Sequence, residues 1–108
     1  MGEYNFLDVL HETQTYFKKL GERPLIIPSH SRGEVDIYFI NQNQVGLVEW
    51  DPISVGCLGI TYRGCAPKDV AHGLGKRFRD SLGLEFKVEE IELVSSLDFF
   101  GGEDARSS

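Results

Sequence analysis

The sequence predicts an α+β domain, a two-layer sandwich in which two helices pack on one face of an antiparallel sheet. Two segments repeat apolar residues every three or four positions, as amphipathic helices do, and five shorter segments show strand-like apolar patterns between turn-forming residues. The 108 residues, 41% of them hydrophobic, suffice for one domain with one core. The expected order is α-β-β-β-β-α-β, with three to five strands in a meander.

The first helix is expected over residues 6–20. Its apolar stripe consists of Phe6, Val9, Leu10, Thr13, Phe17 and Leu20. Asn5 suits the N-cap position, with Asp8 three residues later as in a capping box, and Gly21 suits the C′ position that ends a helix.

A hairpin is the clearest strand signal. Residues 35–40 and 45–50 alternate apolar and polar side chains, and the polar residues 41–44 between them predict the turn. Asn43 tolerates the left-handed backbone that such turns require. We expect Asp51-Pro52 to end the second of these strands.

Two further strand segments flank the hairpin. Residues 24–28 begin and end with proline, which removes ladder donors and predicts an edge strand or a linker. A third strand of the meander is expected at about residues 55–62, with glycines at positions 56 and 59.

The second helix is expected to begin with Pro67 at N1 and to end before Gly83. Its apolar stripe consists of Val70, Ala71, Leu74, Phe78 and Leu82. Gly73 and Gly75 lie inside it, where each glycine costs about 1 kcal/mol relative to alanine. Close approach to the sheet or to the other helix is the favoured reason, and contact with a ligand or partner is the alternative. These glycines do not complete a phosphate-binding loop, because the required surrounding residues are absent.

The last strand is expected over residues 84–94, with a β-bulge at Glu89-Glu90, where the apolar residues switch faces. Residues 1–94 then form the single domain and residues 95–108 a C-terminal tail. Three large apolar residues stand in this tail, which either packs on the domain or docks in a groove of a partner.

The charge pattern disfavours nucleic acid as a partner. The chain has a formal net charge of −6, from 17 acidic and 11 basic side chains, and an acidic protein is repelled by phosphate backbones. Residues 66–83 carry a small basic excess, whereas residues 84–108 are strongly acidic. Such an uneven distribution favours electrostatic steering of a protein partner.

The sequence predicts no catalytic residues and no cofactor. Ser29-His30-Ser31 places hydroxyl groups beside a histidine, but sequence neighbours rarely adopt the geometry of a catalytic triad. Carboxylates occur at Asp36, Glu49 and Glu89-Glu90, on strands whose alternating apolar neighbours indicate solvent-facing positions. We therefore expect a protein that is not an enzyme.

A metal site is not expected either. Cys57, Cys65 and His72 are separated by seven and six residues, whereas structural zinc sites use four ligands in close pairs. Both cysteines are expected to pack in the core. The alternative is a reactive thiol, for which Cys65 is the better candidate because it lies just before a helix N-terminus.

These observations favour a small acidic non-catalytic protein-binding module, such as an adaptor, an inhibitor or an immunity-type protein, that acts by surface complementarity. The residues predicted to contact its partner are Trp50, Lys76, Arg77, Arg79, Glu89, Glu90, Glu92, Leu97, Phe99 and Phe100. The partner is expected to be another protein. Nucleic-acid binding and thiol-dependent activity are the alternatives from other functional classes.

No apolar stretch approaches the roughly 20 residues that span a bilayer, and the N-terminal residues lack the pattern of a secretory signal. With only two cysteines, a cytoplasmic location is expected. In size, acidic charge and element order the chain resembles the small acidic type III secretion chaperones. That resemblance implies a homodimeric chaperone as a further alternative and assigns no site residue.

Overall fold

Helix α1 spans Phe6–Leu20 in the computed structural model, which describes residues 4–92 of the chain. Asn5 caps it as predicted, because its side chain accepts hydrogen bonds from the backbone N–H groups of Leu7 and Asp8. Gly21 ends the helix in a left-handed conformation, with a φ of 76°. The predicted helix and both of its ends are therefore confirmed.

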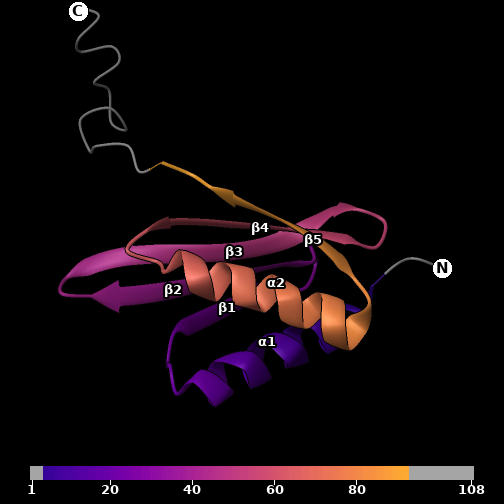
Figure 1. Cartoon of the computed structure of the whole chain (residues 1–108), viewed down its shortest axis with the longest axis horizontal. Coiled ribbons are helices and arrows are strands. Elements are labelled where there is room, and N and C mark those ends of the chain that lie inside the picture. The colour runs from indigo at the N-terminus through magenta and orange to yellow at the C-terminus, as the bar shows by residue number, and fades with distance from the viewer. Residues whose placement is uncertain (1–3, 93–108) are drawn as a thin grey trace, which may run out of the picture.

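The remaining elements follow in the predicted order (Figure 1). They are β1 (Leu25–Ser29), β2 (Glu34–Asn41), β3 (Gln44–Ser54), β4 (Cys57–Gly64), α2 (Lys68–Leu82) and β5 (Glu85–Glu90). The strands lie side by side in chain order, and β1 to β4 form the predicted antiparallel meander. β1 is an edge strand, which is where its proline can be tolerated.

The prediction of a wholly antiparallel sheet is wrong, because β5 runs parallel to β4. Helix α2 connects these two strands and returns the chain along the sheet, and a parallel neighbour requires such a crossover. β5 pairs in regular register up to Glu90, where the strand ends. The β-bulge predicted at Glu89-Glu90 is therefore absent from the strand, and positions 93 and 94 lie outside the described residues.

The hairpin differs from the prediction at both ends. Its turn contains two residues, Gln42 and Asn43, which both adopt positive φ, as a type I′ turn requires. At the other end β3 continues past Asp51-Pro52 to Ser54, so the predicted strand end is wrong. Beyond Trp50, β3 pairs only with β4, and the missing N–H of Pro52 therefore interrupts no ladder with β2.

Both helices contact the same face of the sheet, and Trp50 of β3 shows this directly. Its Nε1 donates a hydrogen bond to Thr13 Oγ1 of α1 at 3.0 Å. Its ring also meets Phe78 of α2 edge-to-face, with 5.8 Å between the ring centroids. The core lies between these helices and this face of the sheet (Figure 1).

The two glycines inside α2 permit close packing on two sides. A Cβ atom at Gly75 would overlap the ring of Phe86 on β5, and one at Gly73 would overlap the hydroxyl of Tyr16 on α1. The interpretation of both glycines as sites of close approach is confirmed.

We predict that Phe17→Ala lowers the free energy of unfolding by about 3–5 kcal/mol, as truncation of a buried aromatic does. Phe17 is fully buried in the C-terminal part of α1 and packs on Phe39. Denaturant unfolding measures the change, and Lys18→Ala on the exposed side of the helix is the control. Equal midpoint shifts for the two variants would contradict the assigned packing of α1.

We also predict that Gly75→Ala destabilises the chain, although the same change stabilises an unhindered helix by about 1 kcal/mol. The added methyl group collides with Phe86, and overpacking of this kind costs about 1–3 kcal/mol. Repeating the substitution in a Phe86→Leu background should reduce the penalty. A more stable Gly75→Ala variant would show that α2 does not approach β5 this closely.

Candidate functional site

Trp50, predicted to contact a partner, is a core residue in the structure. Its side chain is fully buried, and it contacts Thr13, Phe78 and the ring of Phe6. It lies on the face of β3 that the helices cover, because its cross-strand neighbours Val35 and Ile60 are also buried there. We therefore leave Trp50 out of the candidate contact surface.

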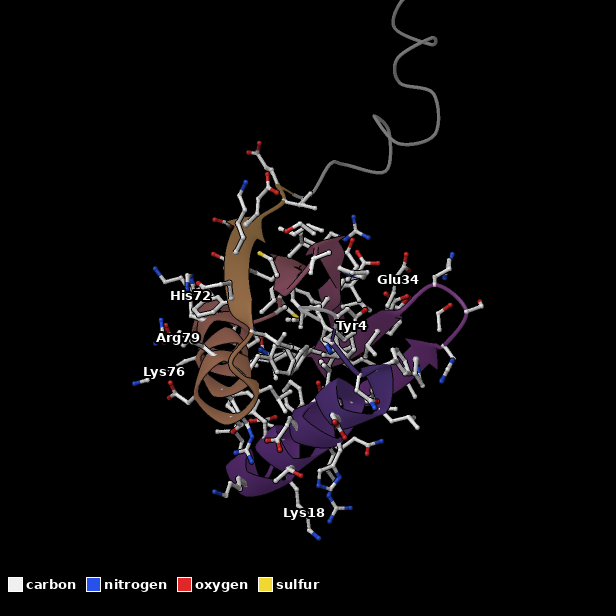
Figure 2. The ribbon with its side chains drawn as sticks, turned by 90° about the vertical axis from the view of Figure 1, so that its right-hand side faces the viewer. Tyr4, Lys18, Glu34, His72, Lys76 and Arg79 are labelled. Carbon is white, nitrogen blue, oxygen red and sulfur yellow. The ribbon has the colours of Figure 1, made fainter. Side chains whose placement is uncertain are left out.

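The predicted basic residues of α2 do not act as one group. Arg77 turns toward α1, where its Nε contacts Glu12 Oε1 at 2.6 Å and both side chains are largely buried. Lys76 and Arg79 are exposed and lie on the outer side of α2 (Figure 2). Arg79 also lies over the ring of Phe86, 5.4 Å from its centroid. Arg77 thus joins the two helices, and only the other two are available to a partner.

The predicted acidic residues are also divided. Glu89 is aligned with Thr61 of β4, on the face turned away from the helices, whereas Glu90 is aligned with Tyr62 on the helix side. Glu92 follows the end of β5 and is exposed. The remaining predicted contacts, Leu97, Phe99 and Phe100, lie outside the described residues.

The two cysteines are free and partly buried. Cys65 directs its thiol toward the carbonyl oxygen of Gln44, at 3.3 Å. Within residues 4–92, no three His, Cys, Asp or Glu side chains lie close enough together to hold a metal ion. None of the helices described is long and apolar enough to cross a membrane.

The sheet face turned away from the helices is the most distinctive surface of the chain, and we call it the open face. It holds alternate residues of every strand: Leu25, Ile27 and Ser29 of β1; Glu34, Asp36, Tyr38 and Ile40 of β2; Val45, Leu47, Glu49, Asp51 and Ile53 of β3; Cys57, Gly59, Thr61 and Arg63 of β4; and Glu85, Lys87 and Glu89 of β5. No helix of the described part of the chain packs on it (Figure 1).

Four carboxylates gather on the open face, and we call Glu34, Asp36, Glu49 and Asp51 the acidic cluster. Asp36 and Glu49 are direct cross-strand neighbours on β2 and β3. Asp36 Oδ1 is buried and receives no hydrogen bond from a donor among the described residues. Within the same residues, the ion pairs of the cluster are limited to Glu34, which lies 3.5 Å from the exposed Arg32.

This crowding changes the titration of Glu49. Partial burial, a hydrogen bond to Asp36 and the negative charges of Asp36, Glu34 and Asp51 raise the pKa of Glu49 to about 7. Burial and the charge of Glu34 also raise the pKa of Asp51. A proton on Glu49 supplies the donor that Asp36 otherwise lacks, which is why the hydrogen bond to Asp36 raises the pKa of Glu49.

Exposed aliphatic side chains border the acidic cluster. The exposed Ile27 is the cross-strand neighbour of Asp36, and the half-buried Leu47 and Tyr38 form the adjacent row. Ile40 and Val45 lie beside the hairpin turn, with Ile40 77% exposed. Large apolar residues exposed together on one face are typical of an interaction surface.

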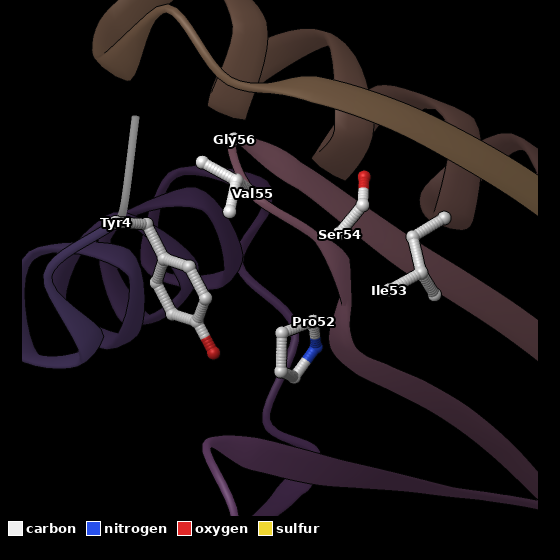
Figure 3. A pocket seen from close by; sticks show the side chains of 6 residues that line it. All are labelled: Tyr4, Pro52, Ile53, Ser54, Val55 and Gly56. Carbon is white, nitrogen blue, oxygen red and sulfur yellow. The ribbon is translucent and has the colours of Figure 1, made fainter. Parts of the chain in front are cut away.

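A shallow groove lies at the end of the sheet where β3 turns into β4 (Figure 3). It has a volume of about 430 Å³ and is lined by Tyr4, Pro52, Ile53, Ser54, Val55 and Gly56. The Tyr4 hydroxyl donates to the carbonyl oxygen of Gly33 at 2.8 Å, so its proton is already engaged. The groove is suited to an apolar side chain and lies next to Asp51, whose carboxylate packs over Gly59 beside Ile53.

Comparison with known proteins gives no match: no family, no curated protein and no solved structure is significantly similar to the chain.

Sequence reasoning placed Asp36 and Glu49 on solvent-facing positions but did not bring them together. The signal for doing so was present. A turn centred on Gln42-Asn43 aligns position 36 with position 49, and the alternation of the strands puts both side chains on one face.

We predict that Glu49→Gln stabilises the chain at pH 8 and has little effect at pH 5. The folded-state pKa of Glu49 lies above its usual 4.5. The stabilising contribution of Glu49 is therefore fully present below pH 4.5 and is lost as the pH rises through about 7. The full shift corresponds to about 3 kcal/mol, which solvent screening at this partly exposed site reduces to about 1–2 kcal/mol.

Urea unfolding at both pH values tests this prediction. Glu22→Gln, at an exposed position beyond the end of α1, is the control for loss of one carboxylate. A Glu49→Gln effect of the same size at pH 5 and pH 8 would contradict the assigned titration.

Proposed function

We propose that this chain is a small, acidic, non-catalytic protein-binding module of the adaptor, inhibitor or immunity type, and that it binds its partner through the open face. The observation that carries the proposal is the combination of a crowded acidic cluster with bordering aliphatic side chains on a sheet face that no described helix covers.

Two features of the open face are unfavourable for the free chain. The exposed Leu25, Ile27, Ile40 and Val45 leave apolar area in water, at about 25 cal/mol for each Å². The acidic cluster brings like charges together, which also lowers stability. A partner that covers the face removes both costs, and natural sequences commonly retain such costs at functional surfaces.

Most interfaces have an apolar centre and polar groups around it. The open face has the reverse arrangement, with the acidic cluster at its centre and exposed aliphatic side chains around it, which favours a partner of complementary charge. A cytoplasmic location belongs to the same proposal, because both cysteines are free and reducing compartments keep thiols in that state.

Affinity capture with the full chain tests the proposed function. We expect a specific protein from a lysate of the source cells to be retained by the wild type and lost when Leu25, Ile27, Ile40 and Val45 are all changed to serine. These side chains are exposed, so the fold should persist, which circular dichroism and the unfolding midpoint check. Removal of this apolar area should weaken binding at least about tenfold.

The matched control is Lys76→Ser/Arg79→Ser, on the outer side of α2 (Figure 2). The captured protein should still bind to this variant. Two results would contradict the proposal: capture of the protein by the open-face variant, or loss of capture in the α2 variant alone. Either result would show that the partner contacts another part of the molecule.

A further inference from the structure

We propose that the protein partner is basic and that it places an arginine or lysine side chain over Asp36 and Glu49 at the centre of the open face. This inference rests on the proposed function and names the chemistry of the partner.

The first support is the geometry of the central row of the sheet. Ile27, Asp36, Glu49, Thr61 and Glu89 are successive cross-strand neighbours on β1 to β5. Directly opposed side chains in such a row are about 5 Å apart, so the two central carboxylates are close enough to share one cationic group. A planar guanidinium donates several N–H groups at once, which suits paired carboxylates.

The second support is the buried Asp36 Oδ1, which has no hydrogen-bond donor within residues 4–92 once Glu49 is ionised. A buried acceptor without a donor is costly, and an incoming N–H group removes that cost. Ile27 on one side and Leu47 on the next row can cover the apolar stem of a long cationic side chain.

The third support is the separation of charge between the two sides of the molecule. The strands place six acidic and two basic side chains on the open face: Glu34, Asp36, Glu49, Asp51, Glu85 and Glu89 against Arg63 and Lys87. The helices α1 and α2 instead carry six basic and four acidic side chains. A basic surface is therefore attracted to the open face and not to the helices.

The cations of the chain itself do not neutralise the centre of the face. Arg63 is aligned with Leu47, and Lys87 is aligned with Gly59. Within the described residues neither forms an ion pair with the acidic cluster, and Arg32 pairs only with Glu34.

Other occupants are less well matched to this charge. A second copy of the chain would set one acidic cluster against another. The segment 93–108 contains three acidic residues and one basic residue, so its charge has the same sign as the face. A metal ion would need at least three converging ligands, and no such group occurs in residues 4–92.

Binding of a cation at this position is coupled to a proton. The cation favours the charged form of Glu49, whose pKa of about 7 is raised by burial and by Asp36, Glu34 and Asp51. Glu89, Arg63 and Lys87 also belong to this face and contribute to its potential. Affinity should therefore rise with pH through about 7, and binding should release a proton.

The test uses the full chain and a defined probe, hexa-arginine amide, with hexa-citrulline amide as the uncharged control. At low salt and pH 7.5 we expect titration calorimetry to detect the arginine peptide only. Amide NMR shifts should centre on β2 and β3. Asp36→Asn/Glu49→Gln should weaken binding at least tenfold, whereas Glu22→Gln/Asp80→Asn, which removes the same charge at exposed positions, should weaken it less than threefold.

Several results would overturn the inference. The arginine peptide could fail to bind, the two charge-matched double variants could weaken its binding equally, or the NMR shifts could centre outside the open face. Occupation by the C-terminal segment would appear as peptide binding only after Leu97, Phe99 and Phe100 are changed to serine in the full chain. Occupation by a second copy would appear as a dimer that is dissociated when Leu25, Ile27, Ile40 and Val45 are changed to serine. A metal site would appear as loss of peptide binding on addition of Ca²⁺.

The inference and the proposed function fail in different ways. Suppose that a captured protein no longer binds to the variant with serine at the four aliphatic positions but still binds to Asp36→Asn/Glu49→Gln. The proposed function then stands and the cation site is wrong. If the arginine peptide binds the acidic cluster while no protein is captured through the open face, the cation site stands and the proposed function is wrong.

Discussion

The hydrogen bond from Trp50 Nε1 to Thr13 Oγ1, at 3.0 Å in the core, fixes the position of α1 on the sheet. The threonine hydroxyl donates in turn to the carbonyl oxygen of Val9 at 2.8 Å, so every polar atom of this relay is satisfied. A buried indole N–H without a partner would cost about 1–3 kcal/mol, which penalises other placements of the helix. Because Phe78 of α2 packs on the same indole, both helices are held on one face of the sheet, and the open face is left to the strands alone.

The sequence permitted good prediction of the ends of α1 and of the close contacts of α2, where local chemistry decides the structure. Asn5 and Gly21 mark the ends of α1 through their own hydrogen-bonding and backbone preferences, and Gly73 and Gly75 indicate close packing because a side chain there would otherwise be favoured. The direction of β5 could not be predicted in this way. Its apolar alternation is the same in a parallel and an antiparallel strand, and only the path of α2 across the sheet determines which one forms.

Trp50 shows why a contact surface is harder to predict than a fold. Both parities of β3 carry large apolar residues, with Val48 and Trp50 on one side and Val45 and Leu47 on the other, so alternation alone does not identify the buried side. The register of the hairpin resolves the ambiguity, because it pairs Trp50 with Val35, whose strand has a continuous apolar face. The same register brings Asp36 and Glu49 together, and the error over Trp50 and the missed carboxylate pair therefore have one cause.

The range of electrostatic forces determines which acidic residues matter at the ionic strength of a cell. The Debye length there is about 8 Å, so charges on exposed segments act weakly on a distant partner. Cross-strand carboxylates about 5 Å apart lie within that length, and partial burial screens them still less. The uneven charge along the sequence favoured steering by the acidic C-terminal residues, whose effect salt largely removes. In the proposed complex the acidic cluster instead acts at contact, where a bound cation would relieve repulsion between Asp36 and Glu49, and its main effect should be on the dissociation rate.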